Sequence, residues 1–374
     1  MNVPFLDLKT PHGRLKKALL DAIEPALLNA QFIGGENVSG FESEFAAFCE
    51  SPHAIAVNSG TDALRFAFLA AGIKPGDVVI TVPNTFIATT EAISQVGAEI
   101  AFTDTDKKNH QMDPVRLEQT VLKLKQENRP VRAVVPVHLF GHCADMDPIF
   151  EIAKKHDLLV IEDACQAHGA VYKGGKKAGA MAAVGCYSFY PGKNLGACGE
   201  GGAVVTSDAD MDRIVRMLRD HGQSKKYIHE IEGYNGRLDA IQAAILRIKL
   251  KHLGEWNAAR RKNAKLYDQL FEGVKGVTVV KEPSWSASVY HLYVIKVAHR
   301  DEVMKKLSDK GVATALHYPI PLHLQDAYKG LGYKKGDFPV SEKQAEEILS
   351  LPMFPELTEE QIRYVVASVK EAIA

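Results

Sequence analysis

The chain has 374 residues, of which 45 are basic and 46 acidic, giving a formal net charge of −1. Because the basic and acidic residues are nearly equal in number, the chain has no overall electrostatic field that would attract nucleic acid or an anionic membrane. An anionic ligand must therefore be bound by local groups. Hydrophobic residues make up 46% and charged residues 24%, as in ordinary globular proteins. The length favours one large domain and one smaller one.

The chain contains an odd number of cysteines and no C-x-x-C pair: Cys49, Cys143, Cys165, Cys186 and Cys198. Their apolar or Gly-rich surroundings favour buried thiols in a reducing compartment over a disulfide framework or a zinc site. The N-terminal residues lack the apolar core of a signal peptide, and no stretch approaches the roughly 20 apolar residues that span a bilayer. We therefore expect a cytoplasmic protein.

Between about Ala54 and Ser207, short β-branched runs alternate with amphipathic segments. This alternation predicts an α/β fold, with a mainly parallel seven-stranded sheet flanked by helices. The expected strands are residues 54–58, 77–81, 99–103, 132–139, 158–163, 185–190 and 202–207, and the expected helices include 61–72, 86–97 and 146–157. Parallel sheets of this kind bind ligands at the carboxyl ends of their strands, so the loops there are where we expect the chemistry.

After Asp208 the pattern changes to a helix, then a polar and aromatic segment at 221–239, then a long helical region to about Phe271. The remainder predicts a small α+β domain with a C-terminal helix from Thr358. We place the large domain at residues 1–257, including the N-terminal arm, and the small domain at 258–374.

The stretch VNSGTDAL at 57–64 is a strand end that opens directly into a helix. Gly60 lets the backbone approach a ligand, and the free amides and positive dipole end of the helix favour a phosphate. The alternative is an ordinary helix cap, with Ser59 or Thr61 as the capping side chain.

The run LLVIED at 158–163 delivers Glu162 and Asp163 to the carboxyl end of the sheet, and Gln166 and His168 follow. An acid in this position beside a cofactor can keep a ring nitrogen protonated through a charge-assisted hydrogen bond. The alternative is an aspartate that caps the next turn.

The stretch GCYSFYPGKNLGACGEGG places Lys193 in a Gly-rich loop after a strand whose Ser188 can reach a phosphate. An amine that forms a Schiff base needs a depressed pKa and room for a cofactor, which a solvated helix face does not provide. A lone lysine is ordinarily a surface residue. Its neighbours favour the cofactor-binding interpretation here.

These motifs resemble, in sequence and order, the DegT/DnrJ/EryC1/StrS sugar aminotransferases, which have the aspartate aminotransferase fold and use pyridoxal phosphate (PLP). The resemblance runs from near residue 32 to beyond residue 357. It rests on FIGGENVSGFESEFAAF, AVNSGTDAL, PNTFIATTEA, VHLFGHCADM, VIEDACQAHGA, SFYPGKNLGA, EGGAVVT, GYNGRLDAIQAAIL, LHYPIPLHLQ and LSLPMFPELT.

The resemblance implies a role for each matching residue. Lys193 is expected to hold the cofactor aldehyde as a Schiff base and to move protons, and Asp163 is expected to pair with the pyridinium nitrogen. Gln166 is expected to hydrogen-bond the ring hydroxyl oxygen, and Phe86 to stack on the ring, where the family often has a larger aromatic residue. Since one branch of the family has histidine in place of the lysine and dehydrates its substrate, Lys193 favours amino transfer.

The resemblance also implies a shared site. The backbone at Gly60 and Thr61, with Ser188, is expected to hold the cofactor phosphate. Asn235 is expected to reach the phosphate of the neighbouring subunit's cofactor, so that a homodimer completes each site.

The expected reaction moves an amino group from L-glutamate, which leaves as 2-oxoglutarate, to a keto sugar linked to dTDP or UDP. The product would be a 3-amino sugar for surface polysaccharide, lipopolysaccharide or secondary-metabolite synthesis. Residues 223–230 resemble the loop of members that act at C3, and amination at C4 is the alternative. The expected substrate contacts are Tyr190, Lys226, Tyr227, His229, His317 and Tyr318.

Two other classes of function are considered. A PLP-binding regulator without turnover is disfavoured because no basic or helix-turn-helix segment precedes residue 32. A nicotinamide-dependent dehydrogenase is disfavoured because VNSGTDAL stands where a G-x-G-x-x-G would open the first strand-helix unit.

Overall fold

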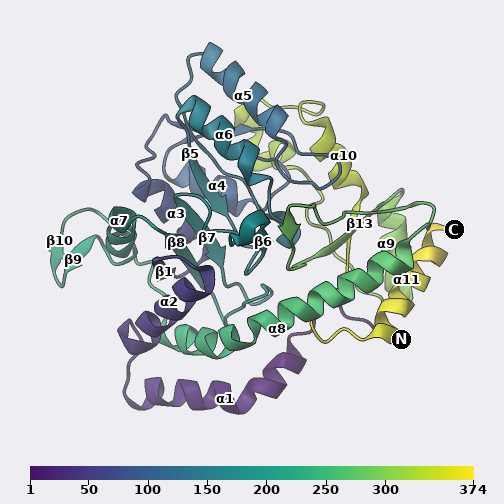
Figure 1. The fold of residues 1–374 in the computed structure, drawn as a ribbon, viewed down its shortest axis with the longest axis horizontal. Helices are drawn as coiled ribbons and strands as arrows, with labels where there is room; N and C mark the ends of the chain where they lie inside the picture. Colours follow the sequence, from purple (N-terminus) through teal and green to yellow (C-terminus); the bar gives the residue numbers. More distant parts are fainter.

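The computed structural model describes all residues, 1–374, and its centre is a seven-stranded sheet in the order β1-β8-β7-β5-β4-β2-β3 (Figure 1). The strands from β3 to β7 are parallel, while β8 is antiparallel to both β7 and β1. The predicted α/β class and mainly parallel sheet are confirmed. The strands are β1 (His53–Val57), β2 (Val78–Thr81), β3 (Glu99–Phe102), β4 (Val131–Val134), β5 (Leu159–Asp163), β7 (Val184–Ser188) and β8 (Gly202–Thr206).

Helices cover both faces of this sheet because successive strand residues point to opposite sides. In β1, Ala54 and Ala56 join one buried cluster, whereas Ile55 and Val57 join the other. The first cluster packs under α2 (Gly35–Cys49), α5 (Pro114–Gln126), α6 (Met146–His156) and the start of α8 (Ala240–Phe271). The second packs under α3 (Gly60–Ala70), α4 (Ala88–Gln95) and α7 (Ala209–Arg219).

The C-terminal part is built on a three-stranded antiparallel sheet in the order β11-β13-β14. A third buried cluster joins this sheet to the second half of α8 and to the C-terminal helix. Its elements are β11 (Val277–Val279), β13 (Tyr293–Val297), β14 (Ile348–Leu351), α9 (Arg300–Asp309), α10 (Pro339–Glu347) and α11 (Glu359–Ile373).

The predicted domain boundary at residue 258 falls inside α8, which runs unbroken for 32 residues. The third cluster supports a small unit on the C-terminal side of this boundary, and Val3 of the N-terminal arm also packs there. Leu322 and Phe338, by contrast, pack in the second cluster, against the large sheet. The division at 258 stays a proposal.

The polar segment after α7 contains a two-stranded hairpin, β9 (Gln223–Lys225) and β10 (Ile228–His229). It projects from the edge of the molecule opposite α9 and α11 (Figure 1). At the other end of the chain, α1 (Lys9–Leu28) packs along α8.

All five cysteines are free thiols, and Cys49, Cys143 and Cys186 are buried as expected. Cys165 is only half-buried, and Cys198 is exposed. The expectation of a buried thiol is wrong for Cys198 because its Gly-rich loop runs over the surface at that point. No helix is both long and apolar enough to cross a membrane.

Candidate active site

Lys193 lies in the loop that follows β7, on a backbone held by its neighbours. Its amide donates to the Tyr190 carbonyl at 2.8 Å. The next side chain, Asn194, is buried and donates to Asn257 Oδ1 at 2.9 Å and to the Val289 carbonyl at 3.0 Å. Burial lowers the pKa of the Lys193 ammonium, while the neighbouring Cys165 and Asp163 act in the opposite direction. The amine is thus shifted toward the neutral, nucleophilic form.

Asp163 ends β5 and is 5% exposed. Its Oδ2 accepts a hydrogen bond from Thr89 Oγ1 at 2.8 Å, and its Oδ1 accepts one from the Cys165 amide at 3.1 Å. The bond from the Cys165 amide is the turn cap that the sequence analysis gave as the alternative role of Asp163. The aspartate therefore caps a turn and also presents a carboxylate at the end of the strand. The carboxylate is held from both oxygens.

Gln166 follows one turn later and is also buried. Its Oε1 accepts from the Phe140 amide at 2.8 Å, and its Nε2 donates to the Tyr318 hydroxyl at 3.1 Å. The rings of Phe86 and Tyr318 are tilted against each other, with centroids 5.8 Å apart. Phe86 is 54% exposed, which leaves most of its ring free to contact a ligand.

The turn at Gly60 forms a close backbone approach at the start of α3. Ser59 caps the helix by accepting from the Asp62 amide at 3.0 Å, which leaves the amides of Gly60 and Thr61 in the first turn without a helical partner. A Cβ atom on Gly60 would lie 2.6 Å from Ser188 Cβ. Only glycine therefore fits between the helix start and the end of β7, and this cradle presents two amides and a hydroxyl to an anion.

His317 and Tyr318 lie on the segment that leads from the small sheet back toward the large one. Tyr318 joins the site through Gln166. His317 Nδ1 lies 2.9 Å from Ser350 Oγ, and its ring stacks on Phe5 with centroids 5.7 Å apart. Burial, together with the Lys193 charge, lowers the pKa of His317 to about 4, which keeps its imidazole neutral near pH 7.

The remaining predicted contacts are not brought to Lys193 within one chain. Lys226, Tyr227 and His229 lie on the projecting hairpin, where all three are exposed. Asn235 is also exposed, and its Oδ1 accepts from Arg237 Nη2 at 2.6 Å. Tyr190, which is 55% exposed, lies three residues before Lys193.

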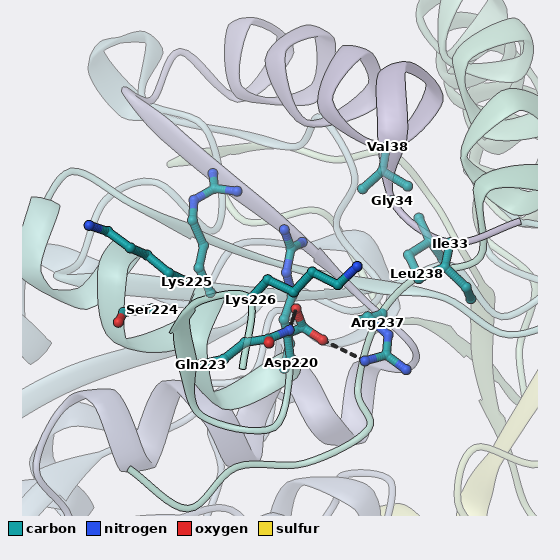
Figure 2. A pocket seen from close by; sticks show the side chains of 12 residues that line it. Ile33, Gly34, Val38, Asp220, Gln223, Ser224, Lys225, Lys226, Arg237 and Leu238 are labelled. Atoms are coloured by element: carbon teal, nitrogen blue, oxygen red, sulfur yellow. Dashed lines mark hydrogen bonds and ion pairs between the residues drawn. The ribbon is translucent and has the colours of Figure 1, made fainter. Parts of the chain in front are cut away.

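Apart from the residues around Lys193, a cavity of about 790 Å³ lies at the base of this hairpin (Figure 2). The start of α2 and the end of α7 form its other walls. Arg237 in its lining pairs with Asp220. The lining residues are Ile33, Gly34, Val38, Arg216, Arg219, Asp220, Gln223, Ser224, Lys225, Lys226, Arg237 and Leu238.

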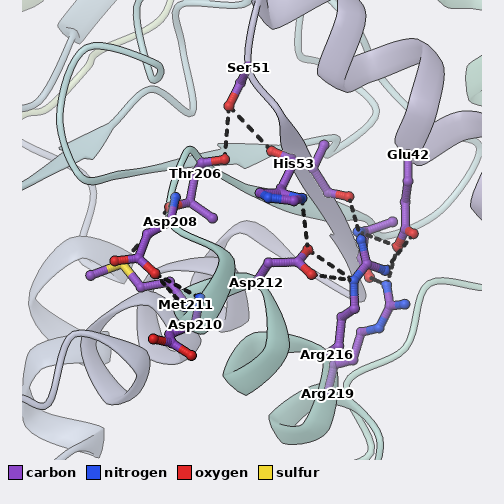
Figure 3. A network of polar contacts seen from close by, with 12 residues as sticks. Glu42, Ser51, His53, Thr206, Asp208, Asp210, Met211, Asp212, Arg216 and Arg219 are labelled. Carbon is purple, nitrogen blue, oxygen red and sulfur yellow. Dashed lines mark hydrogen bonds and ion pairs between the residues drawn. The ribbon is translucent and has the colours of Figure 1, made fainter.

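The other two arginines of this cavity, Arg216 and Arg219, are fixed by a buried carboxylate, as Figure 3 shows. Glu42 pairs with Arg216 at 2.8 Å and with Arg219, and it also accepts from the Ala56 amide at 2.9 Å. The network ties α2, β1 and α7 together, so the hairpin that follows α7 projects from a rigid base.

Three residues that contact the site or its neighbours were not identified from the sequence. Thr89 bonds to Asp163, the Phe140 amide bonds to Gln166, and Gln111 bonds to the Leu139 backbone beside Phe140. Thr89 was placed on a predicted helix, and its contact with Asp163 spans 74 positions of the chain. A hydroxyl in the first turn of a helix after a strand end is the only sequence signal that could have suggested it. Phe140 and Gln111 give no such signal.

The geometry fits PLP on four separate points: an amine of lowered pKa, a strand-end carboxylate, a backbone cradle at a helix start that excludes a Cβ, and an exposed aromatic face. Lysine and aspartate are also the groups that PLP chemistry needs for its aldehyde and its ring nitrogen. The fold and site together define a PLP-dependent enzyme.

Comparison with known proteins identifies the family. The DegT/DnrJ/EryC1/StrS aminotransferase family matches residues 14–370. The chain is 44% identical to "Pleiotropic regulatory protein" of Geobacillus stearothermophilus, over 99% of this chain and 98% of that protein. It is 42% identical to dTDP-3-amino-3,4,6-trideoxy-alpha-D-glucose transaminase of Streptomyces venezuelae, over 99% and 96% of the two chains. The chain belongs to the DegT/DnrJ/EryC1/StrS aminotransferase family.

Solved structures agree. The crystal structure of S. venezuelae DesV in complex with a ketimine intermediate superimposes with a TM-score of 0.95 at 42% identity, covering 99% of this chain and 98% of that one. The structure of ntda from Bacillus subtilis with bound cofactor PMP superimposes with a TM-score of 0.90 at 30% identity, covering 100% and 85%. The protein is an aminotransferase with PLP as its cofactor, and the nicotinamide-dependent alternative is excluded.

Proposed function

We propose that this enzyme transfers an amino group from L-glutamate to C3 of a nucleotide-linked 3-keto sugar. The observation that carries the proposal is the half-buried Lys193 amine of lowered pKa beside the doubly hydrogen-bonded Asp163 carboxylate. These two groups are the ones that amino transfer needs on opposite sides of a cofactor.

Bound PLP supplies an aldehyde that accepts the amino group and a ring that withdraws electrons from the carbon being deprotonated. Asp163, whose two oxygens are oriented by Thr89 and the Cys165 amide, would hold the proton on the ring nitrogen through a charge-assisted hydrogen bond. The Lys193 amine, whose pKa is lowered, would remove a proton from the donor carbon and later return one to the sugar carbon. Phe86 would cover one face of the ring, and the Gly60 cradle would hold the phosphate.

The choice of C3 is supported by the hairpin sequence at 223–230 and by the 3-amino sugar in the name of the Streptomyces venezuelae relative. Lys226 and Tyr227 would supply a cation and an aromatic ring, which suit a diphosphate and a base or sugar. Amination at C4 stays the alternative, and both dTDP- and UDP-linked sugars belong in the test. The product would supply surface polysaccharide, lipopolysaccharide or secondary-metabolite synthesis.

The active unit in this proposal is a homodimer in the cytoplasm. Asn235 and the hairpin are exposed in one chain. In the dimer they would contact the cofactor phosphate and the substrate at the Lys193 site of the partner subunit. Their contacts support this arrangement because Arg237 and Asp220 fix the segment that carries Asn235. Five free thiols suit a reducing compartment.

The deciding experiment is an amino-transfer assay with glutamate against a panel of 3-keto and 4-keto sugars linked to dTDP and UDP. We expect turnover on 3-keto substrates. Activity only on 4-keto substrates would reassign the carbon, and full cofactor binding without turnover on any sugar would favour a regulatory protein. Lys193→Ala is expected to abolish multiple turnover, and full transfer by that variant without added amine would refute the role of the lysine.

A second experiment tests the shared site. Lys193→Ala and Asn235→Ala protomers are purified separately, mixed and allowed to exchange. Random exchange of a two-fold dimer gives one intact site in half of the dimers, so about a quarter of the wild-type activity should return if sites are shared. No recovery would mean that each chain forms its site alone.

A further inference from the structure

Phe140 adopts a backbone conformation that its side chain disfavours. Its φ is +64° and its ψ is 0°, inside a turn at residues 139–141, and it is 1% exposed. A bulky residue in the left-handed region is strained and persists only where its surroundings force it. Such residues concentrate at functional sites.

The surroundings hold this turn from several sides. Gln111, which is 1% exposed, grips Leu139 with both ends of its amide: Oε1 accepts from the Leu139 amide at 3.3 Å, and Nε2 donates to the Leu139 carbonyl at 3.2 Å. The Gly141 carbonyl accepts from Ser288 Oγ at 2.8 Å and from the Val289 amide at 3.1 Å. The backbone on either side of Phe140 is thus fixed.

His138 fixes the start of the same turn. Its Nδ1 accepts from the Ala144 amide at 3.1 Å, and since a backbone amide can only donate, the ring hydrogen must be on Nε2. Nε2 lies 2.8 Å from Glu162 Oε2, and Glu162 also accepts from the amides of Gly179 and Met181, each at 2.7 Å. The turn is therefore bound to the residue that precedes Asp163.

The strained residue points its amide at the site. The Phe140 N–H donates to Gln166 at 2.8 Å, and a donor at this position requires the oxygen of the Gln166 side chain to face it. The Gln166 Nε2 hydrogens are then turned the other way, toward Tyr318 and the proposed cofactor site. A relaxed turn at Phe140 would move this amide and release the carboxamide to rotate.

We propose that the turn at 138–141 is the positioning element that fixes Gln166 with its N–H donors facing the cofactor, and that Gln111 is a positioning residue for it. This inference rests on the proposed contact between Gln166 and the ring hydroxyl oxygen. The Gln111 side chain bonds to the backbone of Leu139 and, at 3.3 Å, to the Asn109 carbonyl, and it has no hydrogen bond to Gln166. Its effect must therefore pass through the turn to Gln166.

The test compares Gln111→Leu, Gln166→Leu and the double variant in the cofactor-loaded enzyme. A donor to the ring oxygen stabilises its ionised form, so loss of that donor changes the pH at which the visible absorption of the bound cofactor titrates. We expect Gln166→Leu and Gln111→Leu to shift this pH in the same direction, by about one unit for the former. The double variant should shift no further than Gln166→Leu alone.

Two further variants separate positioning from general destabilisation. Asn263→Leu removes a buried amide that donates to the Phe354 carbonyl at 3.0 Å in the small domain, and it should lower the unfolding temperature without moving the titration. Gln111→Glu keeps an oxygen that accepts from the Leu139 amide, and it replaces Gln111→Leu in the test if the leucine variant does not fold. We expect it to shift the titration of the cofactor absorption by less than Gln111→Leu does.

The outcomes are distinguishable. A normal titration in both Gln111 variants, or a shift that adds to that of Gln166→Leu, would refute the positioning role while leaving the contact of Gln166 intact. An unchanged titration in Gln166→Leu would refute that contact and the inference together. Neither result would bear on whether the enzyme transfers amino groups, which the assay with keto sugars tests separately.

Discussion

Thr89 donates its hydroxyl hydrogen to Oδ2 of Asp163 across 2.8 Å, at a point where both side chains are buried. The threonine comes from the first turns of α4 and the aspartate from the end of β5. Thr85 Oγ1 lies 2.9 Å from Thr89 Oγ1 and extends the contact into a chain of hydroxyls. The carboxylate that is proposed to hold the cofactor's ring proton is therefore oriented by a neutral partner that costs it no charge.

Thr89→Val tests this contact because valine keeps the shape and removes the hydroxyl. A hydrogen bond to a charged group is worth about 1.5–3 kcal/mol, so kcat should fall by roughly tenfold or more. The visible band of the bound cofactor should shift as well. Steady-state kinetics and absorption spectra measure both effects.

Thr90→Val is the matched control for this variant. Thr90 is also buried, but its hydroxyl bonds to the Ile87 carbonyl and the Tyr328 hydroxyl instead. It should lose stability and keep the wild-type spectrum. Equal spectral changes in the two variants would contradict an orienting role for Thr89.

Gly60→Ala should weaken cofactor binding. The added Cβ would lie 2.6 Å from Ser188 Cβ and 3.2 Å from Cys165 Sγ, so the cradle must open. Overpacking of this kind costs typically about 1–3 kcal/mol, which corresponds to a rise in Kd of roughly fivefold to somewhat over a hundredfold. Titration of the cofactor-free enzyme with PLP gives the value.

Gly254→Ala on α8, where a Cβ meets open space, should leave that Kd unchanged. A wild-type Kd for Gly60→Ala would show that the cofactor phosphate is held elsewhere.

His168 should limit stability in acid. It is fully buried beside Tyr187 and Phe189, neither ring nitrogen has a hydrogen-bond partner, and burial, with the Lys193 charge, lowers its pKa to about 3. Unfolded histidine takes up a proton near pH 6.5, so the stabilisation is complete above that pH and is lost as the pH falls toward 3.

His168→Phe removes this pH dependence. Between pH 7 and pH 5, the free energy of unfolding of the variant should fall by about 2 kcal/mol less than that of wild type. Urea unfolding of the cofactor-loaded enzyme at one protein concentration provides the comparison. Identical pH dependence in the two proteins would show that His168 takes up its proton at the same pH in the folded and unfolded states, and would contradict the lowered pKa.

Lys226→Ala should raise KM for the nucleotide sugar and leave the half-reaction with glutamate unchanged. The lysine is exposed and forms no ion pair, and its ammonium lies over the Tyr227 ring, 5.3 Å from the ring centroid. A charge contact to a diphosphate that adds equally to substrate and transition-state binding changes KM more than kcat. A defect confined to the glutamate half-reaction would place this residue near the donor instead.

The large sheet could be predicted from the sequence because each strand is a short β-branched run between amphipathic helices. The ends of the strands were predicted less accurately. The strand expected at 132–139 ends at Val134, because Pro136 has no backbone N–H to donate to the neighbouring strand. The hairpin at 223–229 was not predicted because its strands are only three and two residues long and carry polar side chains. Short exposed strands have no hydrophobic alternation to reveal them.

The motifs indicated Lys193, Asp163 and Gly60, since each stands at a strand end in a distinctive local sequence. The supporting contacts could not be predicted in the same way. Phenylalanine is not a residue type that predicts a positive φ, so nothing in the sequence marks the turn at Phe140. The contact between Gln111 and Leu139 joins residues 28 positions apart in the chain. Such contacts depend on the tertiary structure and leave no local pattern.

The most direct test of the central claim is to reduce the cofactor-loaded enzyme with borohydride and to locate the cofactor by peptide mass spectrometry. Lys249 is the matched alternative, because it lines the same small cavity as Lys193 and burial lowers its pKa too. Its ammonium already donates to the Gly196 carbonyl. We predict that the visible band disappears and that the added mass is on Lys193 alone, with none in Lys193→Ala. Added mass on Lys249, or none on any lysine of PLP-loaded protein, would contradict the account.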